Sequence, residues 1–190
     1  MEKVSIKTSN NFCPQALFLY GTYKEDGTPN FGTFCWFSYC WDSEMKVMAC
    51  IGGEKLTKDH IHAGKVFSAN LATEALIPYA EYFGNTTGYT KGKMDIPIEI
   101  EHGAVLPVPI LKASPWVFEL EVEQSVPLNG GEIFICKIRN VLAAKELTDE
   151  EKSAEERMEL VAPVIWTSSG NGQYFSLNPI KKETFEKNKT

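Results

Sequence analysis

The chain has 190 residues, of which 43% are hydrophobic, and its 25 acidic and 19 basic residues give a net charge of −6. This length and apolar content predict one domain, 1–190, because two half-length domains would each bury too little surface. The negative net charge gives no general attraction for the phosphate backbone of a nucleic acid. No stretch of the sequence approaches the roughly 20 consecutive apolar residues of a membrane-spanning helix. We therefore expect a cytoplasmic protein with no nucleic-acid or membrane partner.

In chain order, short apolar runs separated by Gly, Pro and Asn turns predict a mainly β protein with a few helices. For the first half we expect strands at 16–23, 31–41, 45–53 and 66–72, a turn at 24–30, and a helix at 56–65 with Thr57 as its N-cap. A helix at 73–84 follows, which Pro78 would restrict or kink. The polar, glycine-punctuated segment 85–95 is expected to be an exposed loop.

The second half contains the clearest local pattern. Residues 116–124 alternate between an apolar face and a glutamate face, and the turn at 128–132 returns the chain into a partner strand from which Lys137 and Arg139 face those glutamates. Next we expect a helix at 147–160 with a Thr148/Glu151 capping box, a strand or hairpin at 164–177, and a frayed lysine-rich tail.

The cysteines and the aromatic stretch 31–41 raise the question of redox chemistry. Five cysteines without a CxxC pair argue against a disulfide framework and a zinc cluster, so we expect reduced thiols. In a single strand, Cys35 and Cys40 would point to opposite faces, and both faces would be apolar. Such a strand is buried on both sides, or one face meets a flat ligand or a second subunit. The stretch alone favours neither interpretation.

The order of several short motifs resembles the flavin reductase-like family with the FMN-binding split barrel, including the flavoredoxins, from about Pro14 to Asp95. The matching motifs are Asn30 with Gly32-Thr33, the strand through Trp36 and Ser38, Lys55-Leu56-Thr57 with Ile61, Phe67 with Asn70-Leu71, and Thr87-Gly88 with Lys93. The resemblance implies a six-stranded antiparallel Greek-key barrel that forms a homodimer, with FMN near the interface.

The resemblance also implies a cofactor site. An isoalloxazine ring would lie along Thr33–Trp36, with Cys35 a small neighbour, and the phosphate would meet the helix N-terminus at Thr57. The complete set of expected cofactor-binding residues is Asn30, Thr33, Phe34, Cys35, Trp36, Lys55, Thr57, Asn70, Leu71, Thr87 and Lys93. No catalytic side chain is expected, because the flavin itself carries the hydride chemistry.

Several of these residues also have a simpler interpretation. Thr57 would cap its own helix, the two lysines would be solvated, Asn30 would close its turn, and Asn70 would bond neighbouring backbone. The chain also departs from the family pattern. Gly92-Lys93 follows Thr87-Gly88 without the acidic member that commonly precedes the lysine, and Lys55 stands where a relative can carry arginine. The missing acidic residue weakens the loop assignments more than FMN binding, and Lys55 would contact a phosphate as a point charge instead of a bidentate fork.

Other motifs are missing from the sequence. His60 and His62 are two residues apart, His102 is isolated, and neither arrangement predicts a shared metal site. The sequence contains no GxGxxG after a strand, no GxxxxGK[ST] and no GxSxG. A nicotinamide would therefore have to stack directly on the flavin.

Three functions remain open at this point. The first is an NAD(P)H-dependent FMN oxidoreductase that reduces flavin or another acceptor, which is a small molecule or a protein. The second is an FMN-holding electron carrier of the flavoredoxin type without its own nicotinamide activity. The third is a barrel for another flat ligand such as haem, with His60 or His62 as candidate axial ligands.

Overall fold

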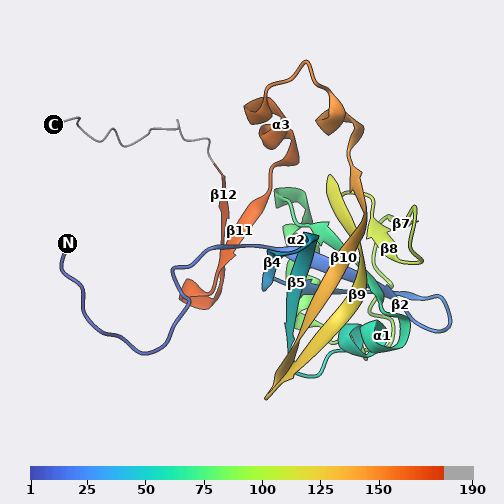
Figure 1. Ribbon diagram of the computed structural model, residues 1–190, viewed down its shortest axis with the longest axis horizontal. Coiled ribbons are helices and arrows are strands. Elements are labelled where there is room, and N and C mark those ends of the chain that lie inside the picture. The colour runs from blue at the N-terminus through green and yellow to red at the C-terminus, as the bar shows by residue number, and fades with distance from the viewer. Residues whose placement is uncertain (178–190) are drawn as a thin grey trace.

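The computed structural model describes residues 1–177, and the predicted lysine-rich tail lies outside them (Figure 1). The described chain is mainly β, with three α-helices. The strands are β1 (Gln15–Ala16), β2 (Phe18–Tyr23), β3 (Pro29–Phe34), β4 (Phe37–Asp42), β5 (Glu44–Gly52), β6 (Val66–Leu71), β7 (Ile100–His102), β8 (Pro109–Leu111), β9 (Trp116–Leu128), β10 (Gly131–Ala143), β11 (Val164–Thr167) and β12 (Gln173–Ser176). The helices are α1 (Leu56–Gly64), α2 (Ile77–Asn85) and α3 (Ala154–Val161).

One antiparallel sheet of seven strands, in the order β3-β2-β6-β9-β10-β5-β4, forms the body of the molecule. Its two edge strands, β3 and β4, are consecutive in the chain and only Cys35 and Trp36 separate them. The sheet must therefore curl until its two edges meet at these residues. Closing a sheet in this way removes exposed edges and encloses a core.

The sheet has seven strands instead of the predicted six because the expected single strand at 31–41 is broken. The Phe37 amide donates to the Cys35 carbonyl at 3.0 Å, and the Cys50 amide donates to the Trp36 carbonyl at 2.9 Å. The break resets the alternation of side chains, so that Phe34 and Phe37 both pack against the core, whereas a continuous strand would send them to opposite faces. The prediction of one continuous strand was wrong at this point.

An aromatic core fills the curled sheet. Phe34 stacks on the fully buried Tyr20 with ring centroids 4.5 Å apart, and Phe37 stacks on Phe18 at 4.1 Å. A second buried cluster lies between the sheet and α2, where Phe31 of β3 stacks on Phe83 at 5.7 Å. Helix α2 is thereby fixed beside β3, which positions one wall of the cleft described below.

Helix α1 begins at Leu56 as predicted but has a different cap, and α2 begins at Ile77, four residues later than predicted. Lys55 is the N-cap of α1, so Thr57 lies inside the first turn and the prediction of a Thr57 cap was wrong. Pro78 lies in the first turn of α2, where its missing N–H costs no hydrogen bond, so it starts the helix instead of kinking it. A 3₁₀ turn precedes α2 at Glu74–Leu76.

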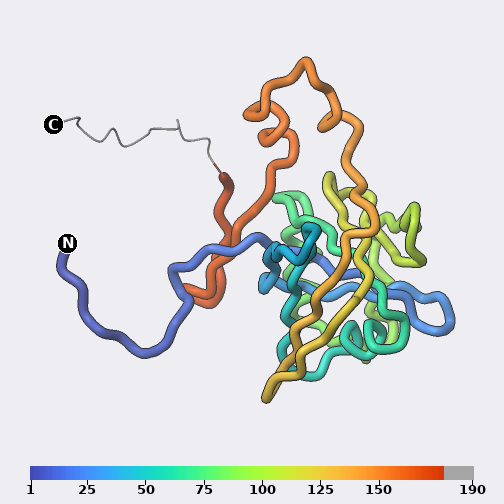
Figure 2. The backbone as a smooth tube through the Cα atoms, in the orientation of Figure 1, coloured from blue at the N-terminus to red at the C-terminus, as the bar shows by residue number. Residues whose placement is uncertain are grey.

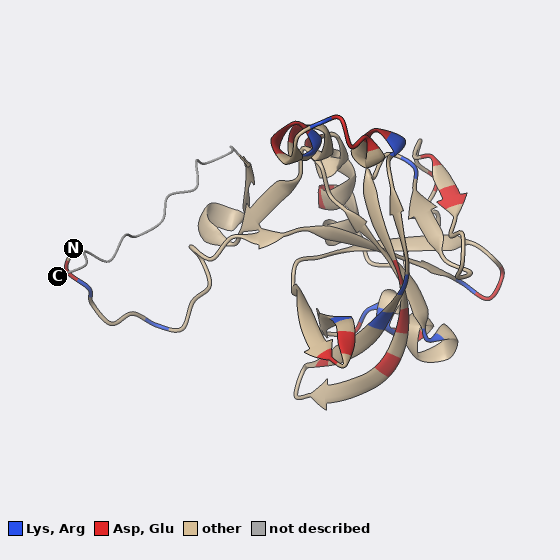
Figure 3. Ribbon diagram, turned by 45° about the horizontal axis from the view of Figure 1, so that its top comes forward, with Lys and Arg blue, Asp and Glu red and all other residues tan. Residues whose placement is uncertain are grey.

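Helix α3 is shorter than the predicted helix at 147–160. Thr148 ends a 3₁₀ turn and donates its hydroxyl to the Lys145 carbonyl at 2.8 Å, so it does not cap a helix. The capping box is formed instead by Ser153 and Glu156, five residues later in the chain than predicted. Acidic residues gather on α3 and the loop before it (Figure 3).

The β9–β10 hairpin confirms the strongest local prediction. Arg139 pairs with Glu121 at 2.6 Å and Lys137 with Glu123 at 3.3 Å, as the expected cross-strand arrangement requires. Glu119, however, is fully buried although it belongs to the same alternating set of glutamates. Its carboxylate accepts hydrogen bonds from the amides of residues 104–106 and from Asn140 Nδ2, at distances of 2.6–2.9 Å. This glutamate therefore anchors the loop that follows β7.

A small sheet of β1, β11 and β12 extends beside the barrel. It contains the hairpin predicted at 164–177, with Trp166 opposite Tyr174. Residues 1–14 are exposed and run away from the barrel as an extended segment (Figure 2). Within residues 1–177, no helix is long and apolar enough to cross a membrane.

Candidate functional site

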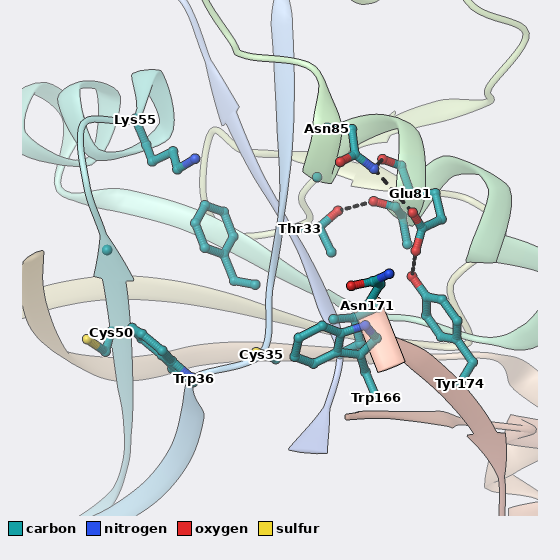
Figure 4. Close-up of a pocket in the computed structure, with 15 residues that line it drawn as sticks. Thr33, Cys35, Trp36, Cys50, Lys55, Glu81, Asn85, Trp166, Asn171 and Tyr174 are labelled. Atoms are coloured by element: carbon teal, nitrogen blue, oxygen red, sulfur yellow. Dashed lines mark hydrogen bonds between the residues drawn. The ribbon is translucent and has the colours of Figure 1, made fainter. Parts of the chain in front are cut away.

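A cleft of about 390 Å³ runs along the end of β3 (Figure 4). One flank carries Trp36, Cys50 and Lys55, and the other carries Glu81 of α2 with Trp166 and Tyr174 of the β11–β12 hairpin. The end of β3 lies between the two flanks. The cleft thus combines apolar aromatic walls with a few polar groups, which is the usual character of a small-molecule site.

A smaller polar pocket of about 180 Å³ adjoins this cleft and shares Thr33, Phe34 and Lys55 with it. It lies at the N-terminus of α1, whose first amides have no intrahelical acceptor. Its lining includes Thr57, Thr87 and Lys93 besides Lys55, and among the described residues no carboxylate lines it. Hydroxyls, lysines and a helix N-terminus without a competing acid form a donor set suited to a phosphate dianion.

Lys93 is the most constrained cation of this pocket. The predicted exposed loop at 85–95 is correct as a loop, but Lys93 within it is only 4% exposed. Its Nζ donates to the Phe31 carbonyl at 2.6 Å and lies 5.5 Å from the ring centre of Phe83. Burial, followed by the positive charges of Lys55 and Lys24, lowers the pKa of Lys93 to about 8. An anion in the pocket would therefore favour the protonated form.

Asn30 contacts Thr57, one of the residues that line the polar pocket. Its side chain is buried and Nδ2 donates to Thr57 Oγ1 at 3.1 Å, so the side chain reaches α1 instead of closing its own turn. Because Thr57 Oγ1 accepts this bond, its own proton is left to donate, and Thr57 lines the pocket. Asn30 Oδ1 is buried and has no hydrogen-bond partner within residues 1–177. A ligand or an ordered water beside Gly88 would supply the missing hydrogen bond to Asn30 Oδ1.

Most of the expected cofactor-binding residues are brought together. The main cleft contains Thr33, Phe34, Cys35, Trp36 and Lys55, and the polar pocket contains Thr57, Thr87 and Lys93. The Thr33 hydroxyl donates to the Ala80 carbonyl at 2.6 Å and so holds α2 against β3.

Asn70 and Leu71 lie elsewhere. Asn70 Nδ2 donates to the Leu19 carbonyl at 2.8 Å, and Oδ1 accepts from the Leu111 amide at 2.8 Å, so its side chain bonds neighbouring backbone. Leu71 packs against the barrel core. Neither residue lines the cleft or the polar pocket, and neither is placed to touch a ligand there.

The sequence-based set of site residues omitted the far flank of the cleft. Glu81, Asn85, Trp166, Asn171 and Tyr174 line it. The pairing of two aromatic residues in the last predicted hairpin was the available signal, but it did not indicate which surface the hairpin would cover. The far flank of the cleft is identified only by the three-dimensional placement of β11–β12 beside α2.

The thiols of the cleft lack the environment of a reactive cysteine, and the histidines do not line the cleft. Burial raises the pKa values of the Cys35 and Cys50 thiols, which keeps both in the less reactive protonated form. His60 Nδ1 lies 3.0 Å from Thr22 Oγ1, and His62 Nε2 lies 2.8 Å from Glu132 Oε2, so the two rings have separate partners and neither lines the cleft. Over the described part of the chain, no group of three or more His, Cys, Asp or Glu residues is arranged to hold a metal ion.

Several solved structures have the same fold as this chain. The chain is similar to the flavoredoxin of Desulfovibrio vulgaris (Miyazaki F), with 20% identity, 97% of this chain and 98% of that chain covered, and a TM-score of 0.84. An FMN-binding protein from Thermus thermophilus with bound p-hydroxybenzaldehyde has 17% identity, 98% coverage of each chain and a TM-score of 0.72. A Shewanella frigidimarina protein with a split barrel domain has 13% identity, coverage of 93% and 89%, and a TM-score of 0.80.

These likenesses establish a split-barrel fold. A family model described as "Flavin reductase like domain" matches residues 10–172. The chain belongs to the flavin reductase-like family. No curated protein matches it.

Proposed function

We propose that this protein is an FMN-binding oxidoreductase that uses NADH or NADPH to reduce flavin or another acceptor. The observation that carries the proposal is the polar, lysine-containing pocket that opens directly into an apolar cleft along β3. A flavin mononucleotide has the same two parts, a dianionic phosphate and a flat, largely apolar ring. Membership of the flavin reductase-like family supports the assignment.

The residues of the chain have distinct roles in this proposal. Lys55, Lys93 and the Thr57 hydroxyl would bind the phosphate at the start of α1. The backbone from Thr33 to Trp36, at the end of β3 and the break after it, would align the ring, since backbone amides and carbonyls match a pyrimidine edge. When bound, FMN supplies the hydride and electron chemistry. The protein contributes orientation and the exclusion of water, and no side-chain acid or base is required.

An FMN-holding electron carrier is the second candidate. The similarity to a flavoredoxin along nearly the whole chain favours it. The acceptor would then be another protein. Mixing the FMN-loaded protein with NADH or NADPH under anaerobic conditions separates the two candidates. Loss of the flavin absorbance near the visible maximum supports the enzyme, and persistent colour with both nucleotides supports the carrier.

We further propose that the protein is a homodimer with FMN near the interface. Exposed apolar side chains lie on β4 and β5 and just before them: Trp36, which precedes β4, and Tyr39, Trp41 and Met45 of these strands are each 49–75% exposed. An apolar groove of about 480 Å³, lined in part by Trp36 and Cys35, continues from these strands to the cofactor cleft. Exposed apolar surface of this kind marks interaction sites, and its continuity with the cleft supports a second copy that would lie beside the cofactor.

The Trp41→Glu variant is expected to be monomeric, because a carboxylate would be buried without a partner in the interface. Size-exclusion chromatography with light scattering measures the mass. Val105→Glu is the matched control, since Val105 is also exposed, at 56%, but lies on the loop after β7. A wild-type protein that is monomeric at micromolar concentration, or a dimer unaffected by Trp41→Glu, contradicts the proposed interface.

A further inference from the structure

On the flank of the cleft away from Lys55, specific contacts hold the side chains in place. Trp166 and Tyr174 are direct partners across β11–β12, and Tyr174 Oη donates to Glu81 Oε1 at 2.6 Å. Figure 4 shows these side chains on the opposite side of β3 from Trp36 and Lys55. The hydrogen bond ties the terminal hairpin to α2, so this flank keeps a defined shape.

The backbone of the hairpin also fixes the indole ring. Gly172 has φ +94°, and a Cβ at this position would lie 2.9 Å from Trp166 Nε1. Only glycine permits both that backbone conformation and that close approach. The indole therefore packs against the hairpin backbone and forms a stable wall.

The two flanks differ in charge. Among the described residues that line the cleft, Glu81 supplies the one carboxylate and Lys55 the one ammonium group. Glu81 Oε1 accepts from Tyr174, and Oε2 accepts from Asn85 Nδ2 at 3.1 Å, so each oxygen retains one acceptor position. Burial and then the neighbouring Glu81 raise the pKa of Tyr174, which keeps its phenol a neutral donor. This flank thus combines aromatic surface with acceptor capacity and negative charge.

We propose that Trp166, Tyr174 and Glu81 hold the second reactant of the flavoenzyme, and that Glu81 selects planar aromatic rings without negative charge. This inference rests on the proposed function, because it takes the Lys55 side of the cleft to be filled by FMN. A flat ring gains from contact with the indole, and an amide or amine on that ring donates to the free acceptor positions of Glu81. A ring carboxylate in the same place meets a like charge and has no proton to donate.

Benzamide and benzoate test the inference, because they have nearly the same shape and differ in charge and donors. Each is titrated into FMN-loaded protein, and the change in the flavin absorption spectrum gives Kd. Wild type is expected to bind benzamide about fivefold more tightly than benzoate, the effect of one like charge at about 5 Å in a solvent-exposed site. Glu81→Gln is expected to bring the ratio close to one.

Two further variants complete this experiment. Glu150→Gln, an exposed residue outside the cleft, serves as the matched control and should keep the wild-type ratio. Trp166→Ala should weaken both probes by about fivefold to tenfold through loss of aromatic contact, while the Kd of FMN stays within about twofold of wild type. Equal binding of the probes by wild type, or an unchanged ratio in Glu81→Gln, overturns the inference.

Titration with FMN distinguishes failure of this inference from failure of the proposed function. A wild-type protein that binds FMN but does not discriminate between the probes contradicts this inference alone. A wild-type protein that does not bind FMN contradicts the proposed function, and the inference falls with it. If Trp166→Ala loses FMN as strongly as it loses the probes, this flank holds the cofactor instead of a second reactant.

Discussion

The double variant Lys55→Ala, Lys93→Met is expected to bind FMN at least about 100-fold more weakly than wild type. Both side chains line the polar pocket at the start of α1. A charge-assisted hydrogen bond to a phosphate contributes about 1.5–3 kcal/mol, so losing two of them costs about 3–6 kcal/mol. Quenching of flavin fluorescence on titration measures Kd directly.

Two controls locate the effect at the phosphate. Lys91→Ala removes an exposed lysine of the same loop that does not line the pocket, so it should leave Kd unchanged. Riboflavin has no phosphate, and the double variant should bind it about as well as wild type does. Equal losses for FMN and riboflavin would show that this pocket does not receive the phosphate.

Lys93 also predicts a pH dependence of FMN binding. Its pKa in the free protein is lowered to about 8, by burial first and then by Lys55 and Lys24. A bound dianion stabilises the ammonium and raises this pKa, so the complex holds a proton that the free protein loses above pH 8. The affinity should therefore be constant from about pH 7 to 7.5, where the FMN phosphate is already a dianion, and fall as the pH rises above about 8. In Lys93→Met this alkaline fall should disappear, and its persistence would assign it to another group.

The Glu119→Ala variant is expected to lose about 3 kcal/mol or more of unfolding free energy. The substitution leaves three backbone amides and the Asn140 side chain without their buried acceptor, and each unsatisfied donor costs about 1–3 kcal/mol before local relaxation. Urea denaturation followed by circular dichroism measures the change. Glu121→Ala on the same strand is the matched control. Its half-exposed pair with Arg139 should contribute less than about 1 kcal/mol.

The contribution of Glu119 should depend on pH with a definite sign. Burial alone would raise its pKa, but the hydrogen bonds from Asn140 and from the amides of residues 106, 105 and 104 outweigh burial and lower it. A pKa below the unfolded value of about 4.3 means that the stabilisation is present above that pH and is lost as the pH falls through the folded pKa. The difference between wild type and Glu119→Gln should therefore shrink in acid. An equal difference at pH 7 and pH 3 would show that the charge is not responsible.

Local patterns predicted those parts of the fold that local forces determine. The alternation in 116–124 predicted the β9–β10 hairpin, and its charges predicted the pair between Arg139 and Glu121. The short segment at 56–65 predicted α1, although the cap lies at Lys55. The ordered motifs along β3, α1 and the loop to Lys93 predicted most residues of the polar pocket, because the barrel brings these three neighbours together.

Features that depend on closure of the whole sheet had no local pattern. The break at Cys35–Trp36 exists because the chain passes there from one edge of the curled sheet to the other. Burial of Glu119 depends on a loop that lies more than ten residues earlier in the chain. Trp166 reaches the cleft only because its hairpin packs beside α2, about 85 residues before it in the chain. Sequence periodicity describes one element at a time and does not contain these contacts.

A crystal structure of the wild-type protein grown with FMN tests the central claim most directly. We expect the isoalloxazine ring along residues 33–36, at the end of β3 and the break after it, and the phosphorus atom between Lys55, Thr57 and Lys93 at the N-terminus of α1. A map in which this pocket stays closed by the protein's own side chains, or in which the ring binds elsewhere, would contradict the account.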